Sequence, residues 1–189
     1  MSNSSPTDAE LVQLINRTSC PVATATLVER HTPRVWAVVF PLLVNHADAD
    51  EVTQATLLNA LQGLSSFRHQ AAFSTWLYRI AINTARNHNR KNRRYRVLHQ
   101  SSSAATDYPS ADYNSPPDSC TYVELTDQIS RAMLELPFAQ RTALVLVAIE
   151  GYDCDTAAQI ARCNPSTLRW RLHRARQRLR TILSNQGVL

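Results

Sequence analysis

One segment of the chain, residues 97–121, has a composition unlike the rest. It reads VLHQSSSAATDYPSADYNSPPDSCT and is rich in Ser, Pro, Asp and Ala, with little apolar periodicity. Such a composition is typical of a flexible linker, although a long ordered loop within one domain is the alternative. Because unstructured stretches of this length are uncommon inside a compact domain, we predict two small domains, residues 1–96 and 122–189, joined by a flexible linker over residues 97–121.

Both predicted domains show the apolar spacing of amphipathic helices. The chain holds only 3 Gly among 189 residues, which disfavours a turn-rich β sandwich or barrel. Capping patterns, apolar residues three or four positions apart, and Gly or Pro stops mark the individual helices. We therefore predict an all-α fold. Helices are expected at about residues 7–15, 23–44, 48–62, from 73 onward, 125–136, 155–161 and from Ser166 onward, and another over the apolar run ALVLVAI, which ends at Gly151.

The helix predicted from Phe73 combines an apolar face with a basic, amide-rich face. Apolar residues recur at helical spacing as far as Thr84, and the side chains away from them are those of Arg79, Asn83, Arg86 and Asn87. A basic helix with aromatic rings nearby suits single-stranded DNA, whose unstacked bases lie on such rings. Candidate rings are those of Phe67, Phe73, Trp76 and Tyr78. Burial in the core is the default interpretation of Trp76 at this spacing.

The second domain carries the pattern of a helix-turn-helix. Residues 155–161 form a short helix, residues 162–165 a tight connection, and Ser166 is a good N-cap for a long helix. The second helix of this motif lies in the major groove, where an Arg side chain can bond guanine N7 and O6 together. The residues nearest the bases would be Arg169, Trp170, Arg171, His173 and Arg174, with Arg176, Arg178 and Arg180 closer to phosphate or solvent.

Positive charge is concentrated in two places. The formal net charge is +5; one cluster runs from Arg86 to Arg96, and seven arginines with no acidic residue follow Asp155. Such clustering indicates a polyanionic partner, because each Arg or Lys near a phosphate releases counterions. A solvated basic face is the alternative for either cluster taken alone.

Several classes of protein are disfavoured by what the chain lacks. No apolar run approaches the roughly 20 residues of a membrane span, and the start MSNSSPTDAELV lacks the features of a signal peptide, so we expect a cytoplasmic protein. The four cysteines show no C-x-x-C spacing, so we expect neither a metal site nor a disulfide framework. No nucleotide-binding or hydrolase motif is present, so we expect no enzyme, cofactor or small-molecule substrate.

Three segments, in order, resemble one family, the extracytoplasmic-function (ECF) sigma factors of the sigma-70 family. DADEVTQATLLNAL and FSTWLYRIAINTARNHNRKNRR are similar to successive parts of the family's region 2. LPFAQRTALVLVAIEGYDCDTAAQIARCNPSTLRWRLHRARQRLR resembles region 4 without a gap. The resemblance extends from about residue 23 to residue 182, and it implies a factor that directs RNA polymerase to promoters.

The resemblance also implies partners and residue roles. The partners would be core RNA polymerase, through its β′ clamp and β flap, promoter DNA, and an anti-sigma factor. The β′ clamp would be bound by Asp50, Glu51, Gln54, Leu57, Leu58 and Asn59. The −10 element would be melted and read by Phe67, Arg68, Trp76, Arg79, Asn83, Arg86, Asn87 and Arg90. The −35 element would be read by Ser166, Thr167, Arg169, Trp170, Arg171, His173, Arg174 and Arg176.

The chain departs from the family pattern at a few of these positions. Ala55 replaces a usual acidic residue and Leu61 a usual Trp, which bears on clamp affinity. Asn87 replaces a common Asp, and Trp170 replaces a small Ser, which bears on promoter preference. Arg162 occupies a turn position where Gly is usual; a left-handed backbone there would cost about 1 kcal/mol. We expect activity with altered specificity.

Two other functions compete with this interpretation. One is a DNA-binding regulator that acts through residues 122–183 alone, without docking onto polymerase. It would bind duplex DNA as tightly in that fragment as in the whole chain. The other is an enzyme, for which the residues offer almost nothing.

Overall fold

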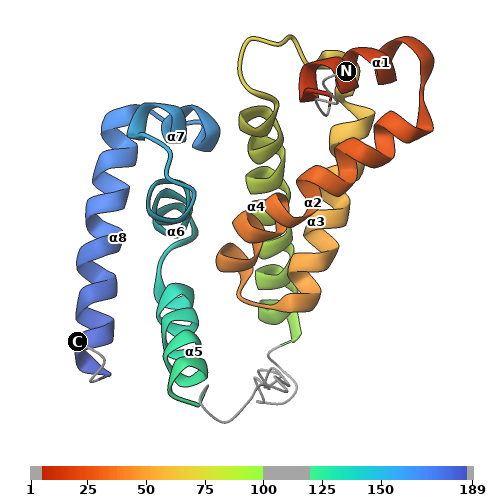
Figure 1. Ribbon diagram of the computed structural model, residues 1–189. Coiled ribbons are helices and arrows are strands. Elements are labelled where there is room, and N and C mark those ends of the chain that lie inside the picture. The colour runs from red at the N-terminus through yellow and green to blue at the C-terminus, as the bar shows by residue number, and fades with distance from the viewer. Residues whose placement is uncertain (1–5, 100–119, 187–189) are drawn as a thin grey trace.

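The computed structural model describes residues 6–99 and 120–186, with side chains for residues 6–95 and 128–186. Those residues form helices and no strand, which confirms the all-α prediction (Figure 1). The first group of helices is α1 (Asp8–Thr18), α2 (Pro21–Leu43), α3 (His46–Gln62), the short 3₁₀ helix η1 (Leu64–Ser66) and α4 (Phe73–His99). The second is α5 (Cys120–Glu135), α6 (Phe138–Leu144), the π-helical turn η3 (Val145–Ile149), α7 (Cys154–Ala161) and α8 (Pro165–Asn185).

The two groups of helices lie on either side of the predicted linker, and the domain bounds themselves stay a prediction. Helix α4 continues to His99 and α5 begins at Cys120, so helices cover both ends of the predicted linker. The intervening residues 100–119 lie outside the described residues. No helix among the described residues is both long and apolar enough to cross a membrane.

The first domain is held together by apolar faces of α2, α3 and α4. Val35, Val38 and Leu42 of α2 and Leu77 and Ala81 of α4 are fully buried. The predicted apolar face of α4 is therefore confirmed at Phe73, Leu77 and Ala81. The buried surface is wider than predicted, because Tyr78 and Ile82 are also buried. These two residues belong to a neighbouring row of α4, since they are four residues apart.

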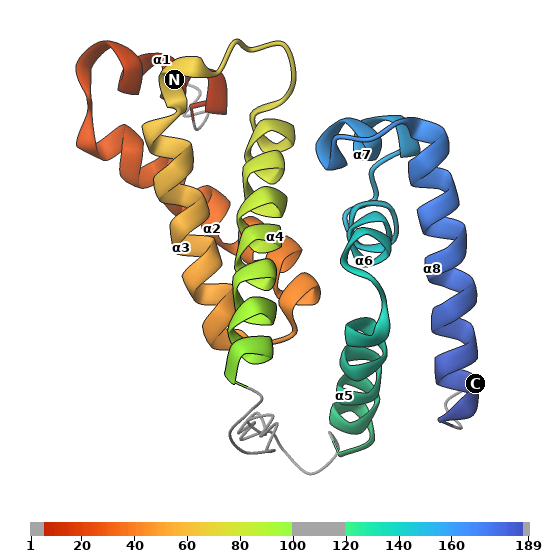
Figure 2. The ribbon, with the colours of Figure 1, turned by 180° about the vertical axis from the view of Figure 1, so that it is seen from behind.

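A second row of buried side chains on α4 is explained by the other domain, which packs against the first. Helix α4 contacts α7, and α2 contacts α5, α6 and η3, so α2 and α4 form the side of the first domain that faces the second (Figures 1 and 2). The Tyr78 hydroxyl donates to Glu150 Oε2 at 3.1 Å, and the rings of Tyr78 and Tyr152 meet edge to face with centroids 6.0 Å apart. Helix α8 lies on the far side of the second domain.

A buried arginine connects the same two domains. Arg141 of α6 is 5% exposed, and its guanidinium donates to the Leu42 carbonyl at the end of α2. It also donates to the carbonyls of Leu134 and Leu136 at 3.2 and 3.1 Å. Burial lowers the pKa of Arg141 to about 10, which leaves the group charged at neutral pH. The charge is thus compensated by helix-end carbonyls, which lack partners within their own helices.

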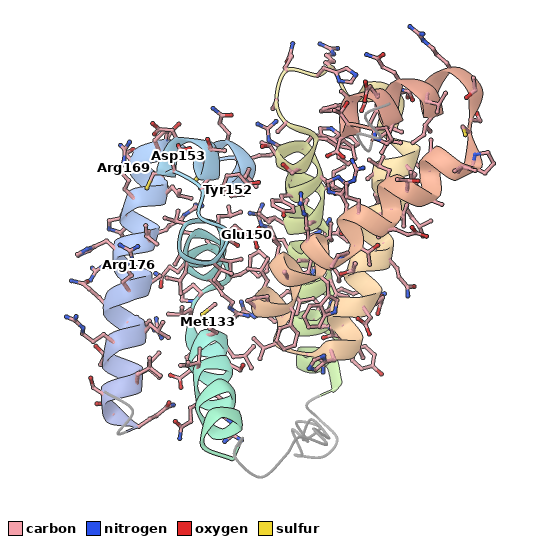
Figure 3. The ribbon with its side chains drawn as sticks, in the orientation of Figure 1. Met133, Glu150, Tyr152, Asp153, Arg169 and Arg176 are labelled. Carbon is pink, nitrogen blue, oxygen red and sulfur yellow. The ribbon has the colours of Figure 1, made fainter. Side chains whose placement is uncertain are left out.

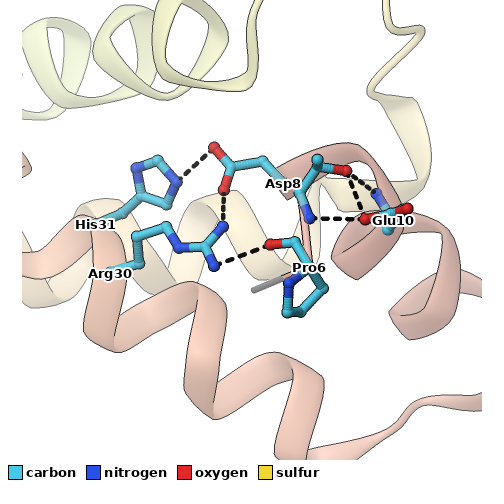
Figure 4. A network of polar contacts seen from close by, with 6 residues as sticks. Pro6, Asp8, Glu10, Arg30 and His31 are labelled. Atoms are coloured by element: carbon cyan, nitrogen blue, oxygen red, sulfur yellow. Dashed lines mark hydrogen bonds and ion pairs between the residues drawn. The ribbon is translucent and has the colours of Figure 1, made fainter. Parts of the chain in front are cut away.

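An ionic network fastens α1 to α2 (Figure 4). Thr7 and Glu10 form the predicted capping box at the start of α1. One oxygen of the neighbouring Asp8 carboxylate accepts from Arg30 at 2.7 Å, and the other pairs with His31 Nε2 at 2.9 Å. His31 is fully buried. Its burial lowers its pKa below the usual value of 6.5, against the opposing effect of the Asp8 carboxylate.

The lowered pKa of His31 makes the stability of the first domain depend on pH. The unfolded chain takes up a proton near the ordinary pKa of 6.5 while the folded chain resists it. The free energy of unfolding should therefore be highest above pH 6.5, fall as the pH drops from there to the lower pKa of the folded state, and level off below it. Urea titrations between about pH 7.5 and 5 should show a smaller fall for His31→Gln than for the wild type. Equal falls would contradict this origin.

The turn between α7 and α8 permits a second test of stability. Arg162 has φ 52° and ψ 55°, a left-handed conformation, at the turn position where the family usually has Gly. Its side chain is exposed, so Arg162→Gly removes strain without removing packing. The free energy of unfolding should rise by up to about 1 kcal/mol in urea titrations. The matched change Gln159→Gly, at an exposed position inside α7, should instead lower it by about 1 kcal/mol; a loss in both variants would contradict the prediction.

Candidate nucleic-acid interface

Helix α8 separates a buried apolar row from a basic exposed face. Leu168, Leu172 and Ala175 are buried against α6 and α7. Helix α8 begins at Pro165 with Asn164 as its N-cap, so the prediction of Ser166 as the cap was wrong. Proline is favoured at the first helical position because its missing N–H needs no partner there.

The residues predicted to read duplex DNA lie on or beside that exposed face. Thr167 and Arg171 are half-buried, and the other predicted residues are exposed: Ser166, Arg169, Trp170, His173, Arg174 and Arg176. Arg169 and Arg176 extend from α8 in Figure 3. The indole of Trp170 is 56% exposed, and the Arg174 guanidinium lies 5.9 Å from its centroid. An open groove beside them is lined by Gln140 of α6 and by Arg174, Arg176, Arg178 and Arg180.

One ion pair lies at the edge of this face. Arg169 Nη2 is 3.0 Å from Asp155 Oδ1, with side chains 59% and 65% exposed. A pair this exposed contributes little to stability. The guanidinium is therefore free to exchange this carboxylate for a phosphate or a base.

A second basic face runs along α4. Trp76, Arg79, Asn83, Asn87 and Arg90 follow one another at intervals of three or four residues, so they share one side of the helix. Asn87 and Arg90 are exposed, and the first three are half-buried. Arg68, in the loop before α4, is exposed, as are Lys91, Arg93 and Arg94 further along the helix. Arg86 lies on another row, where its guanidinium is 5.9 Å from the centroid of Phe138 in the second domain.

The aromatic residues beside this face form a packed cluster. Phe67 lies 5.5 Å from Phe73 and 5.4 Å from Trp76, between ring centroids. The ring of His31 meets Phe73 edge to face at 5.0 Å. Phe67 is only 8% exposed and Tyr78 3%, so the expectation that these rings offer stacking surfaces does not hold in this structure. Trp76, which is half-buried, keeps part of its ring accessible.

The outer side of α3 is acidic and apolar rather than basic. Asp50, Glu51, Gln54 and Asn59 are exposed, and Leu58 is 60% exposed. Leu57, predicted with them, instead packs partly into the core. Sequence reasoning missed Trp36 of α2, whose Nε1–H donates to Asp50 Oδ1 at 2.8 Å. No local pattern connects these two residues, because they lie on different helices.

Known proteins match this chain in both domains. Residues 27–95 match the family Sigma-70 region 2, and residues 126–179 match Sigma-70, region 4. The RNA polymerase sigma-H factor of Pseudomonas aeruginosa is 31% identical over 175 residues, covering 90% of each chain. ECF RNA polymerase sigma factor SigW of Bacillus subtilis is 30% identical over 166 residues, covering 85% of this chain and 89% of the relative.

Solved structures agree with the sequence matches. The sigma factor RpoE of Bartonella quintana, in complex with the anti-sigma factor NepR, is similar with a TM-score of 0.67 and 25% identity, over 85% of this chain and 96% of that chain. Fold and sequence together define a transcription initiation factor of the sigma-70 type, not an enzyme. This chain belongs to the ECF sigma factors of that family.

The packed position of Phe67 predicts a cost in stability when its ring is removed. Phe67→Ala should lower the free energy of unfolding by about 3 kcal/mol or more, because truncation of a buried aromatic leaves a cavity. Trp170→Ala is the matched control, since the exposed indole should change that free energy by less than about 1 kcal/mol. Urea titrations measure both. Similar small losses would show that Phe67 is not packed as described.

Proposed function

We propose that the two basic faces read the two promoter elements while the outer side of α3 docks onto core polymerase. The observation that carries this proposal is the placement of three surfaces of different chemistry on one ECF sigma factor. Basic, exposed residues follow α4 and α8, and the outer side of α3 joins carboxylates to an exposed leucine. A DNA-binding protein without a polymerase partner would have no use for the third surface.

The exposed face of α8 supports a role in reading the −35 element. Arg169, Trp170 and Arg174 extend from its first half, which a helix-turn-helix places against base edges. Thr167 and Arg171, which are half-buried, lie at the edge of this surface. Arg176 and the arginines after it would contact phosphates, which orient the helix without reading sequence.

The face of α4 supports a role at the −10 element. Arg79, Asn83, Asn87 and Arg90 combine amides, which can read unpaired bases, with charges that hold the backbone. Arg68 adds a charge from the preceding loop. Phe67 would act indirectly, because its ring packs against that of Trp76 and supports it. Arg86 becomes fully available only where the second domain leaves α4, since Phe138 now lies beside it.

The outer side of α3 supports docking onto the β′ clamp. Leu58 is the exposed apolar residue of this surface, and Asp50, Glu51, Gln54 and Asn59 are its exposed polar residues. Trp36 fixes the carboxylate of Asp50 through its indole N–H. Leu57 would act by packing beneath the surface. Region 4 would reach the β flap.

Control by an anti-sigma factor is part of the same proposal. The RpoE structure that this chain resembles contains the anti-sigma factor NepR. The similarity covers both domains, so a protein of that kind would find comparable surfaces here. A factor that serves the transcription machinery in this way would act in the cytoplasm.

Run-off transcription tests the proposal as a whole. Purified bacterial core polymerase would be offered a promoter library with and without this protein. We expect specific start sites only when the protein is present, and the selected promoters would reveal both elements. Absence of transcripts from a folded protein that binds duplex DNA equally well through residues 122–183 alone would favour the stand-alone regulator.

A charge introduced at Leu58 on the α3 surface should weaken the binding of this protein to core polymerase. Leu58→Asp places a charge where an exposed leucine would be buried on docking, so core affinity should fall about tenfold or more. Val22→Asp is the matched control, since Val22 is 73% exposed on α2 outside the proposed surfaces. Fluorescence anisotropy with labelled protein measures the affinity of each variant for core polymerase. Equal affinities would exclude Leu58 from the docking surface.

A further inference from the structure

Three side chains of metal-binding type meet between α3 and α4. Asp48 and Glu51 lie three residues apart near the start of α3, which places both carboxylates on one side of that helix. His88 of α4 faces them. One carboxylate oxygen from each acid and an imidazole nitrogen all lie within 4.8 Å of one another.

The two distances from the imidazole to the carboxylates are too long for hydrogen bonds and close to the spacing of ligands around one ion. His88 Nε2 is 3.7 Å from Asp48 Oδ1 and 3.6 Å from Glu51 Oε2. Both separations exceed the roughly 3.2 Å limit of an N–H···O bond. Ligands of a tetrahedral zinc ion, each about 2.0–2.2 Å from the metal, lie roughly 3.3–3.5 Å apart. Small side-chain rotations would therefore bring all three groups onto one ion.

Burial presents the imidazole to the two carboxylates. The His88 side chain is 11% exposed, and its Nδ1 is buried without a hydrogen-bond partner. Nε2 is thus the ring nitrogen with polar neighbours. Asp48 is 34% and Glu51 69% exposed, so one side of the cluster opens to solvent. That opening leaves room for a water molecule as the fourth ligand.

We propose that Asp48, Glu51 and His88 bind a divalent transition-metal ion such as zinc. One imidazole with two carboxylates suits zinc and its neighbours better than calcium or magnesium, which prefer oxygen alone. The ion would connect α3 to α4, the helices that carry the docking surface and the −10 face. We predicted no metal site because the cysteines lack metal-binding spacing. That argument does not apply to a site made of carboxylates and a histidine.

The site has a consequence for docking that rests on the proposed function. Glu51 belongs both to this cluster and to the proposed clamp-binding surface. A divalent cation neutralises the charge of a carboxylate bound to it and occupies one of its oxygens, so that carboxylate has less to offer a partner. Metal binding should therefore weaken docking onto core polymerase, which makes the site a point where metal availability regulates initiation.

Cobalt(II), a spectroscopic substitute for zinc, tests the site in the full chain. After chelator treatment, titration should show saturable binding with visible d–d bands and no thiolate charge-transfer band. Glu51→Gln and His88→Gln should weaken cobalt binding roughly tenfold or more, while Glu29→Gln, an exposed carboxylate on α2, should leave it unchanged. Glu51 is exposed, so its variant keeps the test valid if His88→Gln fails to fold. Undiminished binding in Glu51→Gln, or no saturable binding, would overturn the site.

Core binding with and without zinc tests the consequence separately. Zinc should weaken the binding of the wild type, whereas Asp48→Asn, outside the docking surface, should bind core normally and lose its response to zinc. A zinc response retained by Asp48→Asn would overturn the link to docking. Failure of the metal-free wild type to bind core would instead contradict the proposed function. The metal site is tested independently of that outcome, because cobalt binding is measured without polymerase.

Discussion

The relative position of the two domains depends on one buried charge, the guanidinium of Arg141. The guanidinium donates to two carbonyls of its own domain, Leu134 at the end of α5 and Leu136 just beyond it. It also donates to the Leu42 carbonyl at the end of α2 in the other domain. Helix ends lack internal partners for their last carbonyls, and a buried charge is costly when its partners are removed. The two requirements are met together only while α6 lies against α2.

Further contacts join α2 and α4 to the second domain, and buried residues of both domains belong to one apolar core. They include the Tyr78–Glu150 hydrogen bond, the edge-to-face pair of Tyr78 with Tyr152, and Arg86 beside Phe138. Burial and the nearby Glu150 carboxylate raise the pKa of Tyr78 well above its ordinary value, so its hydroxyl remains a donor at all physiological pH values. Such contacts contribute roughly 1 kcal/mol each. The basic face of α8 is exposed while the two domains are in contact.

Local pattern predicted much of this arrangement because helices bury one face. The apolar spacing of α4 predicted Phe73, Leu77 and Ala81 as core residues, and the capping box at Thr7 is present. Arg162, at the turn position where the family usually has Gly, has the left-handed backbone that Gly adopts most easily. Predictions failed where burial depends on another helix. Tyr78 was a candidate base platform, yet the second domain covers it.

The sequence by itself determined the helices, the helix-turn-helix and membership of the sigma factor family, because period, caps and motif order are local properties of the chain. Tertiary structure alone decided that Phe67 is packed beneath Trp76, that Trp36 holds Asp50, and that His88 meets Asp48 and Glu51. Periodicity says which side of a helix is apolar or polar, but it carries no record of which helix will lie opposite. That information resides in the packing of side chains far apart along the chain.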